Sequence, residues 1–155
     1  MVKPSPANKV LLDTDVVINW LAEEKTPSGK ELWKAPYEIV KLTESKRIES
    51  FISLLTLLEI RFVLRRKKKL SKSFIEQQIE ELLNIFKVLI PDEITLLRAN
   101  KLQSQHSLDP FDALLLSLST TLENPVLISR DTSFLKVAKR YVGTSSPEEL
   151  IKTQT

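Results

Sequence analysis

Cysteine is absent from this chain, which excludes disulfide bonds, iron–sulfur clusters and thiolate zinc sites. The single histidine, His106, excludes a zinc site built on two imidazoles. The two glycines, Gly29 and Gly143, are too few and too far apart for a glycine-rich phosphate loop. The absences therefore argue against ordinary kinase, P-loop and Rossmann enzymes.

Long apolar runs are also missing. No run approaches the ~18 residues that a membrane-spanning helix needs. The first six residues, MVKPSP, lack the apolar segment of a signal peptide. We therefore expect no membrane association and a cytoplasmic location.

The composition is that of an ordinary globular protein, with 42% apolar and 28% charged residues. A length of 155 residues suffices for one domain with its own core. The net charge of +3 and the pI of about 9.1 are compatible with a nucleic-acid partner but do not establish one.

Apolar periodicity predicts strands that alternate with helices. Strands are predicted at 9–12, 48–53, 87–90, 125–129 and 141–144, and helices at 14–24, 30–45, 54–68, 71–86, 92–106, 109–122 and 132–140. Pro36 is expected to kink the second helix or to delay its start. The alternation indicates an α/β fold with a mostly parallel sheet covered on both faces. We expect a flexible tail at 1–8, one domain at 9–145 and a C-terminal tail at 146–155, with a short helical turn at 147–151.

Four acidic residues stand where a nuclease would need them. Asp13 ends one apolar run and Asp131 closely follows another, so both fall just past the carboxyl ends of strands, where open α/β sheets bind ligands. Glu59 and Asp112 lie in two otherwise apolar helical segments. Clustered carboxylates repel one another unless a cation neutralises them. A carboxylate-bound divalent cation is suited to phosphodiester hydrolysis.

Each acid also has a purely structural interpretation. Asp13 and Asp131 could cap the helices that follow them. Asp109 is placed as an N-cap, with Asp112 three residues later as in a capping box. Glu59 aligns with an apolar stripe of Leu55, Phe62 and Val63, so it could form a buried salt bridge or mark the wet edge of that stripe. These alternatives stay open for single residues, while the joint placement favours a site.

The remaining charged features are less specific. A basic run could be a solvated helix end or a phosphate-binding edge, and its members are Arg65, Arg66, Lys67, Lys68 and Lys69. His106 fits a solvent-facing position near a helix end better than the role of a base.

Four short blocks resemble the motifs of PIN-domain nucleases. Residues 10–18 resemble the first block, in which a strand leads into Asp and a hydroxyl residue. Residues 52–60 resemble the second, a Ser-ended strand before a helix that carries Glu. Residues 108–115 resemble the third, around an Asp-Ala pair. Residues 126–134 resemble the fourth, with Ser129 where Thr is usual. The blocks occur in the family's order and span most of the chain.

The resemblance implies a three-layer α/β/α sandwich and a Mg²⁺- or Mn²⁺-dependent ribonuclease. It makes Asp13, Glu59, Asp112 and Asp131 the acidic quartet that binds metal and catalyses hydrolysis. Polar helpers would be Thr14, Asp15 and Ser129, with Asp15 in the outer shell at most.

In its length, this chain is most similar to the VapC-type toxins of toxin–antitoxin pairs. Those toxins act on RNA and are neutralised by a small antitoxin. The resemblance also implies a homodimer. Trp33 and Tyr37 in the segment 25–45 are candidates for its interface, because aromatic residues are enriched in interface cores. The alternative is that this segment packs on its own sheet. Three alternatives remain. The chain could be a catalytically silent PIN-like module that binds RNA or protein, or a structural domain whose acids are all caps. It could also be a nuclease outside toxin–antitoxin systems that matures RNA or cleaves DNA.

Overall fold

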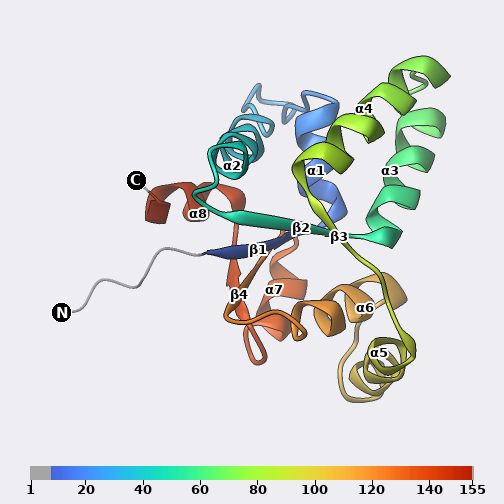
Figure 1. Cartoon of the computed structure of the whole chain (residues 1–155), viewed down its shortest axis with the longest axis vertical. Helices are drawn as coiled ribbons and strands as arrows, with labels where there is room; N and C mark the ends of the chain where they lie inside the picture. Colours follow the sequence, from blue (N-terminus) through green and yellow to red (C-terminus); the bar gives the residue numbers. More distant parts are fainter. Residues whose placement is uncertain (1–7, 155) are drawn as a thin grey trace.

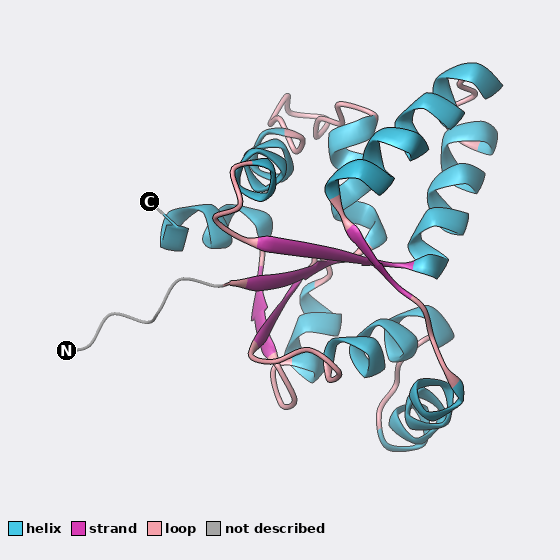
Figure 2. Ribbon diagram, in the orientation of Figure 1, coloured by secondary structure: helices cyan, strands magenta, loops and turns pink. Residues whose placement is uncertain are grey.

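A parallel sheet forms the centre of the molecule, shown here by a computed structural model that describes residues 8–154. Its strands are coloured magenta in Figure 2. They are β1 (Lys9–Leu12), β2 (Glu49–Ser53), β3 (Lys87–Leu89), β4 (Pro125–Ile128) and β5 (Gly143–Ser145). Their order across the sheet is β3-β2-β1-β4-β5, and each neighbouring pair is parallel. β1 therefore lies in the middle, and the chain adds strands first on one side of it and then on the other.

Helices cover both faces of this sheet (Figure 1). One face carries α1 (Thr14–Leu21), α2 (Lys34–Glu44), α3 (Leu54–Arg66), α4 (Lys72–Ile85) and α8 (Pro147–Gln154). The other carries α5 (Glu93–Gln105), α6 (Pro110–Ser119) and α7 (Thr132–Ala138). Right-handed crossovers explain why the helices are divided between the two faces. The chain adds β2 and β3 on one side of β1 and β4 and β5 on the other, and this reversal moves the connecting helices to the opposite face. The predicted three-layer α/β/α sandwich is confirmed.

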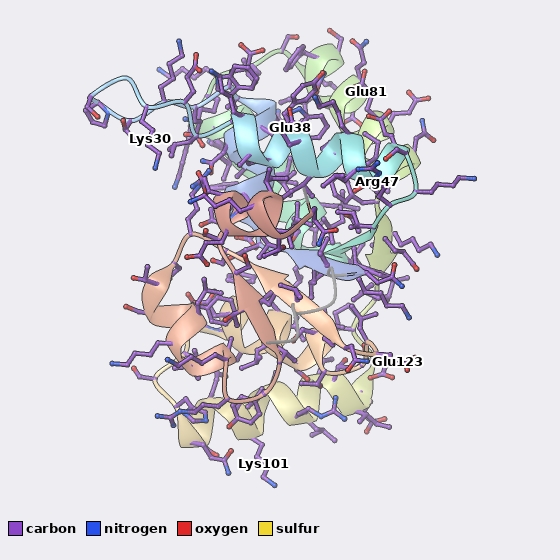
Figure 3. The ribbon with its side chains drawn as sticks, turned by 90° about the vertical axis from the view of Figure 1, so that its left-hand side faces the viewer. Lys30, Glu38, Arg47, Glu81, Lys101 and Glu123 are labelled. Atoms are coloured by element: carbon purple, nitrogen blue, oxygen red, sulfur yellow. The ribbon has the colours of Figure 1, made fainter. Side chains whose placement is uncertain are left out.

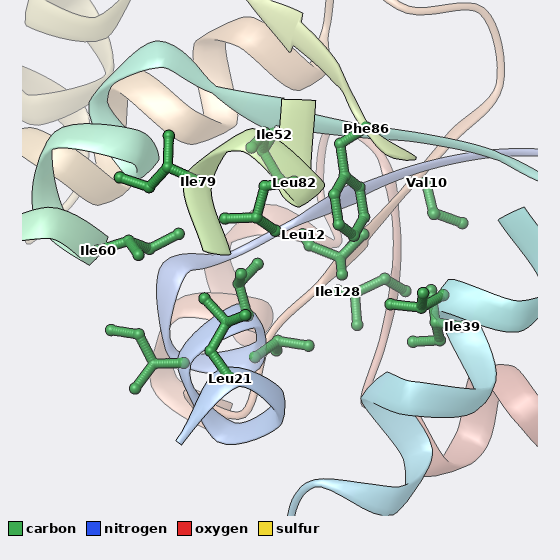
Figure 4. Packing of buried hydrophobic residues seen from close by; sticks show 14 of the residues in the cluster. Val10, Leu12, Leu21, Ile39, Ile52, Ile60, Ile79, Leu82, Phe86 and Ile128 are labelled. Carbon is green, nitrogen blue, oxygen red and sulfur yellow. The ribbon is translucent and has the colours of Figure 1, made fainter. Parts of the chain in front are cut away.

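Two apolar cores lie on the two faces of the sheet. Strand alternation sends Val10 and Leu12 into the first core and Leu11 into the second. Figure 4 shows the first core, where residues of β1, β2 and β4 meet Ile60 of α3 and Leu82 of α4. The strands are thus buried on both sides, which explains their nearly continuous apolar sequences.

Several predicted boundaries differ from the structure. α1 ends at Leu21 and not near Glu24. α2 begins at Lys34, so Pro36 lies in its first turn, where the missing N–H breaks no helical bond and no kink is needed. The expected turn at 147–151 is the longer helix α8, whose Leu150 is only 2% exposed. The predicted domain limits stay a prediction, and most of the tail at 1–8 lies outside the described residues.

Charged side chains project from the surface of the molecule, including the labelled Lys30, Lys101 and Glu123 (Figure 3). Within residues 8–154, no helix combines the length and the apolar character that crossing a bilayer requires.

Candidate active site

The carboxyl ends of β1, β2 and β4 meet at one edge of the sheet. β1 is the strand at which the direction of strand addition reverses, and ligands of open α/β sheets bind outside the strand ends at such a point. The backbone N–H of Asp13 donates to the carbonyl of Ile128 at 2.9 Å, which joins the ends of β1 and β4. The topology therefore places residues after β1 beside residues after β4.

Four helices begin at this edge, and three of them are capped by aspartates. The side chain of Asp13 accepts from the backbone N–H of Thr14 at 2.7 Å. Asp109 accepts from the N–H of Asp112 at 2.8 Å, and Asp131 accepts from that of Phe134 at 3.0 Å. Ser53 caps α3 in the same way. The structural interpretation of these aspartates as caps is thus correct, and the helix N-termini also bring partial positive charge to the acids.

An open pocket of about 100 Å³ lies among these helix starts. It is lined by acidic residues from separate parts of the sequence, together with small polar and apolar side chains. The acids are Asp13, Glu59, Asp109 and Asp112. Three of the four predicted quartet members therefore share one pocket.

Asp131 takes a different position. It is exposed, and it is not among the residues that line the pocket. Its charge nevertheless raises the pKa of both Asp13 and Asp112. The structure thus places Asp131 near the pocket, at its outer rim.

Asp13 is held from two sides. Its Oδ2 accepts a 2.8 Å hydrogen bond from the Ser129 hydroxyl, and its Oδ1 accepts from the Thr14 N–H. The Ser129 hydroxyl oxygen in turn accepts from the backbone N–H of Asp131 at 3.1 Å. Burial raises the pKa of Asp13, these hydrogen bonds oppose the rise, and the charges of Asp131 and Asp109 add to it. Ser129 therefore links two predicted acids through one hydroxyl.

Glu59 is positioned by Thr14, whose hydroxyl donates to Oε1 at 3.0 Å. The Thr14 hydroxyl also lies 3.1 Å from that of Thr56. Since a hydroxyl carries one proton, Thr56 can donate to Thr14 while Thr14 donates to Glu59. Burial raises the pKa of Glu59, the Thr14 bond opposes this, and the charges of Asp13 and Asp109 raise it further.

The predicted inner face of α3 was partly wrong. The buried residues of α3 are Thr56, Ile60 and Leu64, whereas Phe62 is 58% exposed. Glu59 lies at the edge of the buried stripe and faces the pocket. Among the described residues no Lys or Arg is within ion-pair distance of it, which excludes the buried salt bridge.

Two other acids carry the largest resolved shifts. Burial, followed by the charges of Asp109 and Asp13, raises the pKa of Asp112 to about 7. Burial and the Asp13 charge raise the pKa of Asp15 to about 7 as well, although it accepts from the N–H groups of Val16 and Arg130. Asp15 is not among the residues that line the pocket. Perturbed acids gathered at a cleft are typical of a functional site.

Three polar residues that line the pocket were not among the predicted site residues: Ser53, Thr56 and Asp109. Asp109 was interpreted as a cap alone, yet it also raises the pKa of Asp13, Glu59 and Asp112. Its spacing of three residues from Asp112 could have revealed this, because residues three apart share one side of a helix.

The pocket suits a hydrated divalent cation. All of its candidate ligands are oxygens, which Mg²⁺ and Mn²⁺ prefer. Within the described residues, no three acidic groups approach closely enough to enclose an ion directly. Mg²⁺ keeps several waters and binds through one or two carboxylates, so a spaced set of acids fits it. A cation would also relieve the repulsion that raises these pKa values.

The basic run lies away from the acids, at the end of α3 and in the residues that follow. All of its members are exposed, and Lys68 forms a 2.7 Å ion pair with Glu24. Arg65 and Arg66 line a separate hollow with Leu58 and Phe62. At ~1.5 Å per helical residue, Arg66 lies about 10 Å along α3 from Glu59. His106 contacts the Tyr141 hydroxyl through Nε2 and lies outside the acidic pocket.

Comparison with known proteins gives a family and a fold. The sequence model of the PIN domain matches residues 10–140. No curated protein sequence matches the chain. VapBC2 from Rickettsia felis, bound to a DNA fragment from its promoter, has a similar structure with a TM-score of 0.69 and 14% identity, covering 89% of this chain and 98% of that one.

Two further structures have the same fold. FitAcB from Neisseria gonorrhoeae gives a TM-score of 0.64 at 19% identity and covers 90% of this chain and 98% of that chain. PAE2754 from Pyrobaculum aerophilum gives 0.66 at 20% identity, with coverage of 95% and 97%.

Proposed function

This chain belongs to the PIN domain family, and we propose that it is a Mg²⁺- or Mn²⁺-dependent endoribonuclease that acts as the toxin of a toxin–antitoxin pair. The observation that carries the proposal is the convergence of Asp13, Glu59 and Asp112 on one pocket, with Asp131 at its rim. These residues come from the four stretches that resemble the family motifs, all within the matched residues 10–140. We place this activity in the cytoplasm, as part of the same proposal.

We assign the quartet Asp13, Glu59, Asp112 and Asp131 to cation binding. Ser129 would orient Asp13, and Thr14 would orient Glu59, through the hydrogen bonds that they donate. Asp109 adds a further negative charge to the pocket. The chemistry that a bound divalent cation supplies is a lowered pKa of water and neutralised charge on the scissile phosphate. No protein nucleophile is required.

The substrate that fits best is a single-stranded or looped RNA, whose unstacked bases can be read. Its phosphates need cationic contacts outside the acidic pocket. The exposed basic run at 65–69 offers them, at a distance that a few nucleotides can span. In this assignment Arg65, Arg66, Lys67, Lys68 and Lys69 bind the backbone of the RNA.

An antitoxin partner is proposed because one similar structure, from Klebsiella pneumoniae, is named a toxin–antitoxin complex. The chain itself has a suitable surface on α3. Leu58 and Phe62 are each 58% exposed, and they line one hollow with Arg61, Arg65 and Arg66, of which Arg61 is ion-paired with Glu76. An acidic amphipathic segment would match both its apolar and its charged parts. That surface shares Arg65 and Arg66 with the proposed RNA contacts, so one partner would exclude the other.

We retain a homodimer as part of the proposal but assign it to another surface. In the segment 25–45, Ile39 and Val40 are buried in the first core, which leaves Tyr37 as its exposed large apolar residue. A larger apolar surface follows β3, where Ile90, Ile94 and Leu97 are all more than half exposed. Light scattering should show a dimer that Leu97→Glu disrupts. A wild-type monomer at high micromolar concentration would contradict this part of the proposal.

The proposal is tested by adding metal to metal-free protein in the presence of a labelled single-stranded RNA and a DNA of the same sequence. We expect RNA cleavage with Mg²⁺ or Mn²⁺, and none with EDTA. RNA binding without cleavage at any metal concentration would identify a silent binding module. Cleavage confined to DNA would overturn the substrate assignment.

A further inference from the structure

Arg130 stands between Ser129 and Asp131, two of the residues assigned to the site, but its side chain does not line the pocket. The guanidinium instead makes contacts with three other segments. Nη1 donates to both carboxylate oxygens of Glu148 at 2.8 and 3.0 Å. Nε donates to Oδ1 of Asn19 at 2.5 Å, and Nη2 donates to the carbonyl of Leu32 at 2.7 Å. One side chain thus ties the turn after β4 to α8, to α1 and to the loop before α2.

The backbone of the same turn contacts the acids. The N–H of Arg130 donates to Oδ2 of Asp15 at 3.4 Å, and the N–H of Asp131 donates to the Ser129 hydroxyl. That hydroxyl donates to Asp13. The turn at 129–131 therefore carries contacts to the acids on its backbone and its Ser129 side chain, and contacts to the rest of the fold on its arginine.

The partners of Arg130 are themselves fixed. Asn19 donates from Nδ2 to Glu24 at 3.0 Å, which directs its Oδ1 toward the arginine. The other carboxylate oxygen of Glu24 accepts from Lys68. Glu148 belongs to the first turn of α8, a helix anchored by the buried Leu150. The Arg130 side chain is 19% exposed, so these contacts are partly shielded from water.

We infer that Arg130 is a positioning residue and that Glu148 on α8 is its main support. By bracing the turn at 129–131, the pair holds the Ser129 hydroxyl against Asp13 and keeps Asp131 at the rim. The inference rests on the proposed metal-dependent function. Its physical basis is that reacting groups tolerate little displacement, since a shift of ~1 Å can cost about 100-fold in rate. Residues that orient metal ligands commonly affect metal affinity by ~10–100-fold.

The chain provides a matched control for this idea. Glu148 and Glu149 are neighbours in the first turn of α8, so both interact with the same helix dipole. Glu149 is exposed, and its side chain has no hydrogen bond or ion pair in the described structure. Glu148→Ala and Glu149→Ala thus remove the same charge from the same helix, and only the first removes the support of Arg130.

The experiment measures three quantities for the wild type and both variants: the Mn²⁺ dissociation constant by calorimetry, the single-turnover rate of RNA cleavage at saturating Mn²⁺, and the unfolding temperature. We expect Glu148→Ala to raise the dissociation constant and to lower the rate, each by about 10-fold. Glu149→Ala should stay within twofold of the wild type in both. Arg130→Lys should resemble Glu148→Ala, because a lysine cannot reproduce the planar fork that reaches three partners.

The outcomes separate this inference from the function on which it rests. Glu148→Ala could lower the unfolding temperature and still keep the Mn²⁺ dissociation constant and the cleavage rate within twofold of Glu149→Ala. That result would mean that the Arg130–Glu148 ion pair has a purely structural role. If Glu148→Ala does not fold, Arg130→Lys decides by the same criteria. A wild-type protein that neither binds Mn²⁺ nor cleaves RNA would overturn the proposed function, and this inference with it.

Discussion

The Thr14 hydroxyl donates a 3.0 Å hydrogen bond to Oε1 of Glu59 and thereby joins the start of α1 to the middle of α3. Among the described residues this neutral donor takes the place of a cation beside Glu59. A carboxylate that is half buried and lacks a cationic partner destabilises the metal-free protein. The contact is therefore what we expect if Glu59 binds a cation, as proposed above.

The environment of Glu59 predicts the effect of the substitution Glu59→Gln. The carboxamide can still accept from Thr14, while the charge that burial and neighbouring acids disfavour is removed. We expect cleavage to fall by on the order of 100-fold or more. Urea unfolding should show an unchanged or higher free energy of unfolding, with the exposed Glu81→Gln as the control. If the variant unfolds and its folded fraction stays active, Glu59 is a structural residue.

Asp13→Asn tests metal binding separately from folding. Asparagine caps a helix about as well as aspartate, so the bond to the Thr14 N–H can be kept. Calorimetry on metal-free protein should show that Mn²⁺ binding weakens by about 10-fold or more. The exposed Glu123→Gln should bind Mn²⁺ as the wild type does. Equal affinity in Asp13→Asn would remove Asp13 from the cation site.

EDTA should abolish cleavage without unfolding the domain. The reason is that two apolar cores support the sheet on its two faces, independently of any cation. Circular dichroism before and after chelation measures this directly. Loss of helical signal on chelation would show instead that the cation is part of the folded structure.

The stability of the metal-free protein should depend on pH in a defined direction. The pKa values of Asp15 and Asp112 are raised from an ordinary 3.8 to about 7, chiefly by burial. Between these values the folded protein binds more protons than the unfolded chain, so the free energy of unfolding falls as the pH rises from about 4 to about 7. Thermal unfolding at pH 5 and pH 8 should show this loss.

Two changes should reduce that pH dependence. Asp112→Asn removes one of the titrating groups, so its unfolding temperature should differ less between pH 5 and pH 8. Mg²⁺ should restore stability at pH 8 in the wild type, because a ligand that binds the folded form stabilises it. A flat profile in the metal-free wild type would contradict the burial of these acids.

If the basic run at 65–69 binds RNA phosphates, removing its charges should change how RNA binding depends on salt. Lys67 and Lys69 are exposed and have no ion pair in the described structure, whereas Lys68 is engaged by Glu24. Changing all three lysines to Gln should weaken RNA binding. The slope of log K against log salt should flatten by about 0.7 for each phosphate contact that is lost. Lys101→Gln on α5 is the control, and an unchanged slope in the triple variant would leave the run as a solvated helix end.

Strand patterns made the sheet predictable, because the short runs before Asp13, Ser53 and Ser129 are buried on both faces and leave few alternatives. The parallel order then brings the residues after these runs to one edge. The three aspartate caps could also be predicted, because an N-cap bonds to a backbone N–H within the next few residues and needs no distant partner.

Other features depend on tertiary packing and could not be read from the chain. α3 has apolar residues around most of its circumference, so its periodicity could not tell that Ile60 is buried and Phe62 exposed. α8 is short and mostly polar, and Leu150 becomes buried because α2 and β5 lie beside it. The partners of Arg130 come from three distant segments, which no spacing reveals.

The four acids are proposed to act together on RNA, and substituting each of them by its amide is the sharpest test of that role. Asn keeps the caps that Asp13 and Asp131 provide, so Asp13→Asn, Glu59→Gln, Asp112→Asn and Asp131→Asn change charge with little change in the fold. The measurement is the single-turnover rate of RNA cleavage at saturating Mn²⁺. We expect the rate to fall on the order of 100-fold or more in each folded variant. Wild-type rates in these variants would contradict that role.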